Sequence, residues 1–129
     1  MLFRSLAQQL RVLDRAEQLP VGTADAVLAD VPCSNTGVLG RRVEVRHRLR
    51  PDSFAQMAVT QRELLQHALR IVRPGGRVVY STCSIEPEEN EDVVRSVLRP
   101  GVEVLRRELT LPSAGRHDGG FFAVLRCSP

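Results

Sequence analysis

Two short apolar runs, each followed closely by a polar segment that contains a cysteine, constrain the fold of this chain most strongly. The runs are Ala24–Asp30 and Arg77–Thr82, and the cysteines that follow them are Cys33 and Cys83. Runs of this kind are typical of β-strands buried on both faces of a sheet. Such strands belong to parallel sheets, in which a long crossover, usually a helix, connects one strand to the next.

The segment between the two runs predicts such a helix. Apolar residues recur with a helical period over 54–72, and the Pro-Gly-Gly segment at 74–76 ends the pattern. Asp52 or Ser53 can serve as the N-cap, with Gln56 placed as in a capping box. The other predicted elements are a short helix at 2–9, a weak strand at 11–13, a polar loop at 33–51, a helix that begins at Pro87 and ends at Pro100-Gly101, and strands at 102–109 and 121–125.

This order of elements predicts an α/β fold with a mostly parallel sheet and crossover helices, formed as one domain over residues 1–129. Three cysteines are too few, and odd in number, for a disulfide scaffold. No apolar run approaches the roughly 20 residues of a membrane span, and the first residues lack the layout of a signal peptide. We therefore expect a cytoplasmic protein of a reducing compartment that has no membrane partner.

The charges of the chain are unevenly distributed. All 18 basic residues are arginine, which excludes lysine chemistry such as a Schiff base or a phosphate-loop lysine. Residues 41–50 form a basic stretch, whereas residues 86–92 form an acidic one that suits the N-terminus of the predicted helix. The basic stretch contains Arg41, Arg42, Arg46, Arg48 and Arg50.

The two cysteines that follow the strands are predicted to face one site. Neighbouring parallel strands lie about 5 Å apart, so the loops after Ala24–Asp30 and Arg77–Thr82 can converge. Two small core cysteines, a metal pair and a redox disulfide are alternative interpretations of Cys33 and Cys83. No further cysteine or suitably spaced histidine completes a zinc site, so no metal is predicted, and Cys127 is interpreted as a bystander.

The residues around both cysteines resemble the hallmarks of a known family. The segment Asp30–Gly37 reads D-V-P-C-S-N-T-G and is similar to the D-x-P-C-S-x-T-G motif of the Sun/Fmu-like RNA 5-methylcytosine methyltransferases. The segment Thr82–Glu91 resembles the family's second motif, T-C-S followed by P-E-E-N-E. Asp118–Phe122 is similar to the family's D-G-F-F, with one extra glycine. The resemblance extends over about residues 25–126.

This resemblance implies a Rossmann-like class I methyltransferase fold with a C-terminal antiparallel strand, and S-adenosylmethionine as the cofactor. It implies that Cys83 is the nucleophile that adds to carbon 6 of cytosine, and that Cys33 assists release of the methylated product. It also implies that Asp30 hydrogen-bonds the target base. Asp30, Asp14 and Pro32 are the expected cofactor contacts.

The resemblance also implies an RNA substrate, ribosomal RNA at the level of the family, with the five arginines of the basic stretch as RNA contacts. The family's glycine-rich cofactor loop and first strands have no counterpart before Asp30, so a domain truncated at its N-terminus is expected. The strand 24–30 would then have an open apolar edge, for which we expect a homodimer or a pairing partner. The alternative function is an inactive remnant or an RNA-binding module with an incomplete cofactor site.

Overall fold

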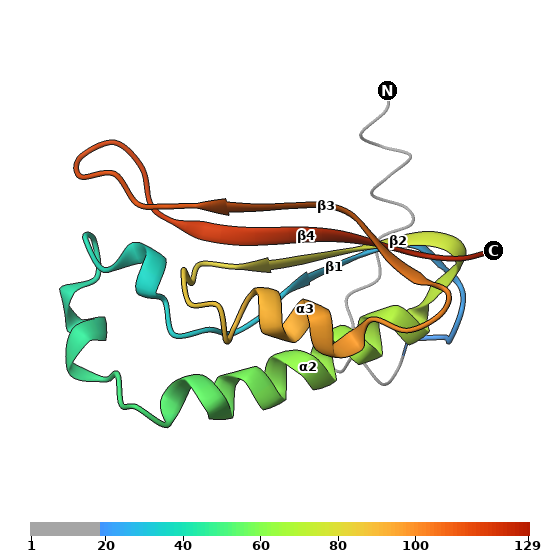
Figure 1. The fold of residues 1–129 in the computed structure, drawn as a ribbon, viewed down its shortest axis with the longest axis horizontal. Coiled ribbons are helices and arrows are strands. Elements are labelled where there is room, and N and C mark those ends of the chain that lie inside the picture. The colour runs from blue at the N-terminus through green and yellow to red at the C-terminus, as the bar shows by residue number, and fades with distance from the viewer. Residues whose placement is uncertain (1–18) are drawn as a thin grey trace.

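A four-stranded mixed sheet, covered on one face by two helices, forms the protein (Figure 1). The structure is a computed structural model that describes residues 19–129, so the helix and strand predicted at 2–9 and 11–13 lie outside the described residues. The strands are β1 (Ala24–Asp30), β2 (Val72–Thr82), β3 (Val102–Thr110) and β4 (Gly120–Cys127). The helices are α2 (Ser53–Ile71) and α3 (Glu91–Val97), and the short 3₁₀ helices are η2 (Thr36–Val38) and η3 (Val43–His47).

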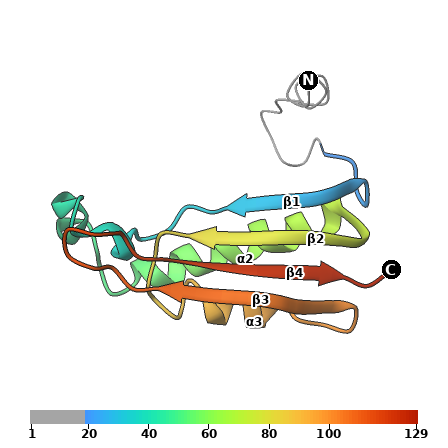
Figure 2. The same cartoon turned by 90° about the horizontal axis from the view of Figure 1, so that it is seen from above.

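The strands lie in the order β1-β2-β4-β3. Strand β1 is parallel to β2, while β4 is antiparallel to both β2 and β3. Three strands therefore run in one direction and the C-terminal strand runs in the other, as Figure 2 shows, and this confirms the expected α/β fold. Because β4 is inserted between β2 and β3, β1 and β2 form the one parallel hydrogen-bonded pair within residues 19–129.

The register of this parallel pair determines where the two cysteine-containing loops begin. Asp30, the last residue of β1, lies opposite Ser81 of β2. The amide of Val31 then donates to the Ser81 carbonyl oxygen at 3.1 Å, so the two strands end side by side. The expected convergence of the two loops at one edge of the sheet follows from this register.

The hydrophobic core lies between the sheet and the two helices. Alternate residues of β2 and β4 face the helices and are buried, which is the two-residue period expected of strands. Helix α2 contributes Leu65 and Leu69, both almost fully buried. The buried core residues from β2, β4 and α3 are Val78, Tyr80, Phe121, Ala123, Leu125, Val93, Val94 and Val97.

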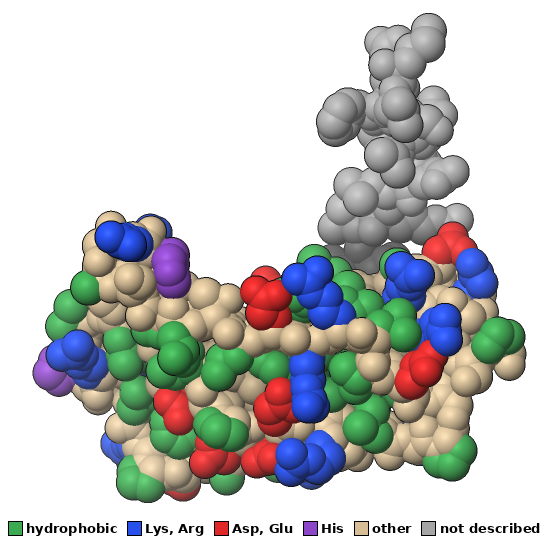
Figure 3. All heavy atoms as spheres, turned by 45° about the horizontal axis from the view of Figure 1, so that its top comes forward, with side chains coloured by type: hydrophobic (Ala, Val, Ile, Leu, Met, Phe, Trp, Pro, Cys, Tyr) green, Lys and Arg blue, Asp and Glu red, His purple; other side chains and the backbone are tan. Residues whose placement is uncertain are grey.

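The opposite face of the sheet carries no helix from the described residues. On this face, Leu28 of β1 lies next to Val79 of β2, which in turn lies next to Val124 of β4. Leu28 is 69% exposed. Hydrophobic side chains lie among arginine and acidic side chains on the surface that Figure 3 shows. Strand β1 is an edge strand within residues 19–129, in agreement with the expected open edge.

Three local predictions differ from the structure. Strand β2 begins at Val72 rather than Arg77, because the chain continues directly from α2 into the sheet and residues 73–76 form an irregularity in β2 opposite Asp25. A Cβ atom at Gly76 would lie 2.8 Å from the carbonyl oxygen of Asp25, so this close approach requires glycine. Helix α2 ends at Ile71, before the Pro-Gly-Gly segment as predicted, and residues 74–76 form an irregular part of the strand.

The predicted capping box is absent, since the N-cap Asp52 makes no side-chain capping hydrogen bond. The hydroxyl of Ser53 instead accepts a hydrogen bond from the amide of Arg50 at 3.2 Å. Helix α3 begins at Glu91 rather than Pro87, because residues 87–90 form turns. In the described part of the chain, no helix has the length and apolar character that a membrane crossing requires.

Candidate active site

The sulfur atoms of Cys33 and Cys83 lie 3.2 Å apart. Cys33 follows β1 and Cys83 follows β2, so the parallel register brings residues 50 positions apart in sequence into contact. Both cysteines are free thiols. Cys33 is buried, whereas Cys83 is half-buried and is therefore the more accessible of the two sulfurs. The structure brings together the two cysteines that the sequence pattern singled out.

Asn35 completes the immediate surroundings of the two sulfurs. The Cys83 thiol donates to Oδ1 of Asn35 at 2.7 Å, and the Cys33 sulfur lies 3.8 Å from the same oxygen. Asn35 has a φ of 62° and is the one non-glycine residue with positive φ in residues 19–129. Asparagine tolerates this left-handed conformation better than most residues. Sequence analysis did not assign a role to Asn35, although its place between Cys-Ser and Thr-Gly was a usable signal.

The environment of Cys33 keeps its thiol protonated. Burial, followed by the hydrogen bond with Cys83, raises the pKa of Cys33 from its ordinary value of 9.0 to about 12. A thiol with this pKa is neutral at physiological pH. Cys33 can therefore donate a hydrogen bond to a neighbouring sulfur anion, but it is a poor nucleophile itself.

A buried carboxylate connects the two cysteine loops behind the sulfurs. Glu89 is fully buried, and its Oε2 atom accepts hydrogen bonds from the hydroxyls of Ser34 and Ser84, each at 2.5 Å. Its Oε1 atom accepts from the Ser34 amide at 2.8 Å and from Nε2 of Gln61 at 3.0 Å. The carboxylate thus accepts hydrogen bonds from the residues that directly follow each cysteine.

The burial of Glu89 corrects one sequence expectation. The sequence placed the acidic stretch 86–92 at the N-terminus of a helix that begins at Pro87. The stretch is instead divided, because Glu88 is exposed, Glu89 is buried in the site and α3 begins only at Glu91. The spacing of charges along the chain cannot reveal which of two adjacent glutamates points inward.

The loop that contains Cys83 is further stabilised by its own polar side chains. Oδ1 of Asn90 accepts from the Thr82 hydroxyl at 2.6 Å, and its Nδ2 donates to the Ser84 carbonyl oxygen at 2.9 Å. The Tyr80 hydroxyl donates to the carbonyl oxygen of Glu89 at 2.5 Å. Asn90 and Tyr80 are almost completely buried, so these bonds are shielded from water.

Gly37 joins three segments at the rim of the site. Its amide donates to the Cys83 carbonyl oxygen at 2.9 Å, and its own carbonyl oxygen accepts from the Gly119 amide at 2.8 Å. A Cβ atom at Gly37 would lie 2.7 Å from the Cys83 oxygen and would overlap the Gly119 carbonyl. Gly119, the first glycine of the D-G-G-F-F segment, thus contacts the loop that contains Cys33.

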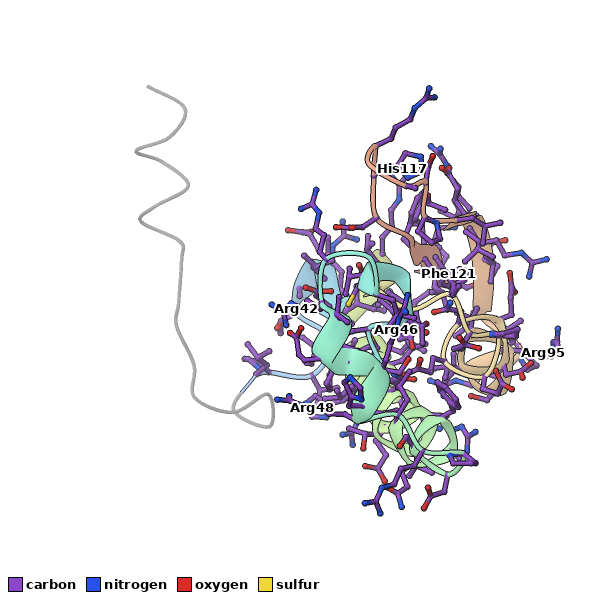
Figure 4. All side chains as sticks on the ribbon, turned by 90° about the vertical axis from the view of Figure 1, so that its left-hand side faces the viewer. Arg42, Arg46, Arg48, Arg95, His117 and Phe121 are labelled. Atoms are coloured by element: carbon purple, nitrogen blue, oxygen red, sulfur yellow. The ribbon has the colours of Figure 1, made fainter. Side chains whose placement is uncertain are left out.

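The five arginines of the basic stretch are all exposed in the structure. Figure 4 shows Arg42, Arg46 and Arg48 on the segment that contains η3, at one end of the molecule. Nε of Arg41 lies 3.4 Å from a carboxylate oxygen of Asp118 in the loop between β3 and β4. The basic stretch therefore presents cations beside the end of the sheet where β1 and β2 terminate.

Of the three expected cofactor contacts, the structure describes Asp30 and Pro32. Asp30 is exposed at the end of β1, where a carboxylate can accept hydrogen bonds from a ribose or an ammonium group. Pro32 is exposed, and its carbonyl oxygen already accepts from Nε2 of Gln61 at 2.8 Å. Asp14 lies outside the described residues. Residues 19–129 contain no group of three or more side chains suited to hold a metal ion.

Comparison with known proteins adds the family context. Residues 7–127 match the family model described as 16S rRNA methyltransferase RsmB/F. The chain is 42% identical over 93 residues to the Ribosomal RNA small subunit methyltransferase F of Cronobacter sakazakii, a match that covers 70% of this chain and 19% of that protein. The chain thus spans about a fifth of the length of this relative.

Two solved structures are similar to the chain. The structure titled "Crystal Structure of PH0851" superposes with a TM-score of 0.80 at 36% identity, over 87% of this chain and 28% of that one. The structure of NSun6 from Pyrococcus horikoshii with SFG superposes with a TM-score of 0.68 at 28% identity, over 79% of this chain and 29% of that one.

Proposed function

Because the chain belongs to the family described as 16S rRNA methyltransferase RsmB/F, we propose that it carries the cysteine site of an rRNA cytosine-5 methyltransferase. The observation that supports this most directly is the 3.2 Å separation of the Cys33 and Cys83 sulfurs at the ends of two parallel strands. Ligands of open α/β sheets bind at this edge, beyond the carboxyl ends of the strands. A cytosine placed there would meet both thiols.

Cys83 is the proposed nucleophile. Carbon 5 of cytosine is a poor nucleophile, and addition of the Cys83 sulfur to carbon 6 converts the ring into an enamine whose carbon 5 can attack a methyl group. The hydrogen bond to Asn35 orients the Cys83 thiol before this attack. Asp30, at the end of β1, is the proposed partner of the ring nitrogen of the base.

Cys33 is proposed to assist product release. After methyl transfer, a water molecule takes the carbon 5 proton, and the electron pair of that C–H bond re-forms the C5–C6 double bond and expels the Cys83 sulfur from carbon 6 as a thiolate. The protonated Cys33 thiol, 3.2 Å from that sulfur, can stabilise the departing thiolate by donating a hydrogen bond. The raised pKa of Cys33 suits this role as a donor.

S-Adenosylmethionine, when bound, supplies the methyl group that carbon 5 accepts. The exposed Asp30 carboxylate fits one edge of such a site because it can bind the ammonium or ribose hydroxyls of the cofactor. Asp14 and Pro32 remain the further proposed contacts. The described residues thus provide the nucleophile side of the reaction and one edge of the cofactor site.

The RNA is proposed to lie across the basic stretch. Arginine pairs with phosphates through two parallel hydrogen bonds and stacks on unpaired bases. The side chains proposed to contact RNA are Arg41, Arg42, Arg46, Arg48 and Arg50. The proposed substrate is small-subunit ribosomal RNA, and a cytoplasmic location is part of the same proposal.

Covalent trapping tests the catalytic assignment. A Cys33→Ala variant mixed with small-subunit rRNA and S-adenosylmethionine is expected to accumulate a protein–RNA adduct that survives denaturing electrophoresis. The double variant Cys33→Ala/Cys83→Ala is expected to form none, whereas Cys33→Ala/Cys127→Ala should trap as much RNA as Cys33→Ala. Absence of an adduct in the Cys33→Ala reaction contradicts the role of Cys83.

A second candidate function is an RNA-binding module without catalysis, and the exposed arginines of the basic stretch favour it equally. Titration calorimetry separates the two functions. Binding of RNA together with S-adenosylmethionine supports the methyltransferase, whereas binding of RNA with no heat from the cofactor supports the binding module.

A further inference from the structure

A hollow of about 320 Å³ lies beside the cysteine site and has no role in the chemistry described above. One wall is the loop around η2, which contributes Gly37, Gly40 and Arg41. The other wall is the segment Pro112–Asp118 between β3 and β4. The volume of the hollow is at the lower end of the range for sites that hold small molecules.

The hollow has a fixed frame in the structure. The far wall is a tight turn in which the Ser113 amide donates to the His117 carbonyl oxygen at 3.0 Å and Gly115 adopts a φ of +71°. Two contacts tie this wall to the near one. They are the Arg41–Asp118 ion pair at 3.4 Å and the hydrogen bond from the Gly119 amide to the Gly37 carbonyl oxygen at 2.8 Å.

One residue connects the hollow directly to the proposed nucleophile. Gly37 lines the hollow, and its amide donates to the carbonyl oxygen of Cys83 at 2.9 Å. A ligand in the hollow would therefore lie one backbone hydrogen bond away from the loop of Cys83. A single-stranded substrate whose target base meets Cys83 can therefore place a neighbouring nucleotide in this hollow.

The chemistry of the walls suits a ribonucleotide. Arg41 and Arg116 supply cations from opposite walls, and arginine binds phosphate through parallel hydrogen bonds. His117 adds an aromatic ring, and Figure 4 shows it at the same end of the molecule as Arg42 and the other labelled arginines of the basic stretch. Gly40 has no side chain and borders open space, where a flat base can approach the backbone closely.

We propose that this hollow holds the nucleotide adjacent to the target cytosine in single-stranded RNA, with its phosphate on the arginines of the two walls. The proposal rests on the proposed function, because it places both nucleotides on the same RNA. The Arg41–Asp118 pair does not oppose it, since both side chains are partly or largely exposed and such pairs contribute little stability. A phosphate can therefore replace Asp118 as the partner of Arg41.

Filling the hollow tests the proposal. A Cβ atom at Gly40 would meet no atom within 4 Å, so a Gly40→Leu side chain can occupy open space without disturbing the fold. Fluorescence anisotropy with a labelled single-stranded RNA that contains one cytosine is expected to show about tenfold weaker binding by Gly40→Leu. Arg116→Ala, a change at an exposed position, should also weaken binding and reduce the salt slope by about one.

Arg95→Ala is the matched control, because Arg95 is an exposed arginine of α3 that Figure 4 shows away from His117. It is expected to bind the RNA within about twofold of the original protein. Removing the nucleotides that flank the cytosine should weaken binding to the original protein and leave the already weak binding of Gly40→Leu almost unchanged.

The outcomes separate this proposal from the catalytic one. Wild-type affinity in both Gly40→Leu and Arg116→Ala overturns the nucleotide site, even if Cys83 forms its adduct. Failure of the original protein to bind the RNA overturns it as well. Weaker binding by both variants, without any Cys83 adduct, supports the nucleotide site and contradicts only the chemistry.

Discussion

The hydroxyl oxygens of Ser34 and Ser84 lie 3.4 Å apart, and each serine directly follows one of the two cysteines. Both hydroxyls donate to the same oxygen of Glu89. The spacing of the sulfurs is therefore supported from behind by one buried carboxylate that holds both loops. This arrangement makes Glu89 a positioning residue in the proposed reaction, because it acts through the serines rather than on the base.

Replacement of this carboxylate should loosen both loops. Glu89→Gln replaces one acceptor oxygen with a donor that faces groups already donating, so we expect the free energy of unfolding to fall by about 1–3 kcal/mol. Urea denaturation measures this change. Glu88→Gln, at the exposed neighbouring position, is the control and should leave the unfolding midpoint unchanged. Equal midpoints for the two variants would show that the carboxylate does not support the loops.

Gly37 and Gly40 form a matched pair for a second prediction. Gly37→Ala places a methyl group 2.7 Å from the Cys83 carbonyl oxygen, so the loops must separate, and we expect a loss of about 1–3 kcal/mol in stability. Gly40→Ala meets no atom within 4 Å and should be close to neutral. Thermal unfolding of both variants checks the difference, and a Gly37→Ala protein as stable as Gly40→Ala would contradict the close contact.

The pKa of Cys33 predicts how stability depends on pH. In the unfolded chain this thiol ionises near its ordinary pKa of 9.0, whereas in the folded protein burial and the bond to Cys83 raise the pKa to about 12. The unfolded state therefore loses its proton first, and the free energy of unfolding decreases as the pH rises from 9 towards 12. The expected loss from Cys33 alone is about 1 kcal/mol between pH 9 and pH 10.

Urea denaturation at pH 8, 9 and 10 measures this dependence, with Cys33→Ala as the variant that should show a shallower decline. Burial also raises the pKa of Tyr80, followed by the effect of the Glu89 charge, so some decline above pH 10 should persist in that variant. Burial likewise raises the pKa of Cys127. Identical slopes for Cys33→Ala and the original protein would contradict the raised pKa of Cys33.

Strand β1 is an edge strand within residues 19–129, and this edge predicts self-association. A hollow of about 240 Å³ along this strand is lined by apolar side chains that include Val27, Leu28 and Leu64, and Leu28 is 69% exposed. We expect the 129-residue chain to form a homodimer through this edge, because unpaired apolar edge strands pair readily. Light scattering should report the mass of a dimer, and Leu28→Glu should reduce it towards that of a monomer.

Leu111→Glu is the control for this substitution, since Leu111 is 61% exposed and lies outside the strands. It should leave the mass of the assembly unchanged. A well-folded monomer of the original chain, at the concentrations used for the variants, would contradict pairing through β1.

The elements with local signals could be predicted from the amino-acid pattern alone. The apolar run at 24–30 predicted β1. The helical period between 54 and 72 predicted α2, because burial of one helix face imposes its period on the sequence. The pattern also predicted that Cys33 and Cys83 share one edge of the sheet, since parallel strands end on the same side. Capping at Ser53 and the start of β2 were predicted wrongly, because several local solutions compete at the ends of elements.

Which side chains contact one another could not be predicted from the amino-acid pattern, because it depends on how the elements pack. Glu88 and Glu89 are adjacent and chemically identical, yet packing of the two cysteine loops buries the second and leaves the first in solvent. The hydrogen bond between Asn35 and Cys83 joins segments that are distant in sequence, and so does the one between Gly37 and Gly119. Such contacts depend on strand register and on shape, which are properties of the assembled core and leave no periodic signal in the chain.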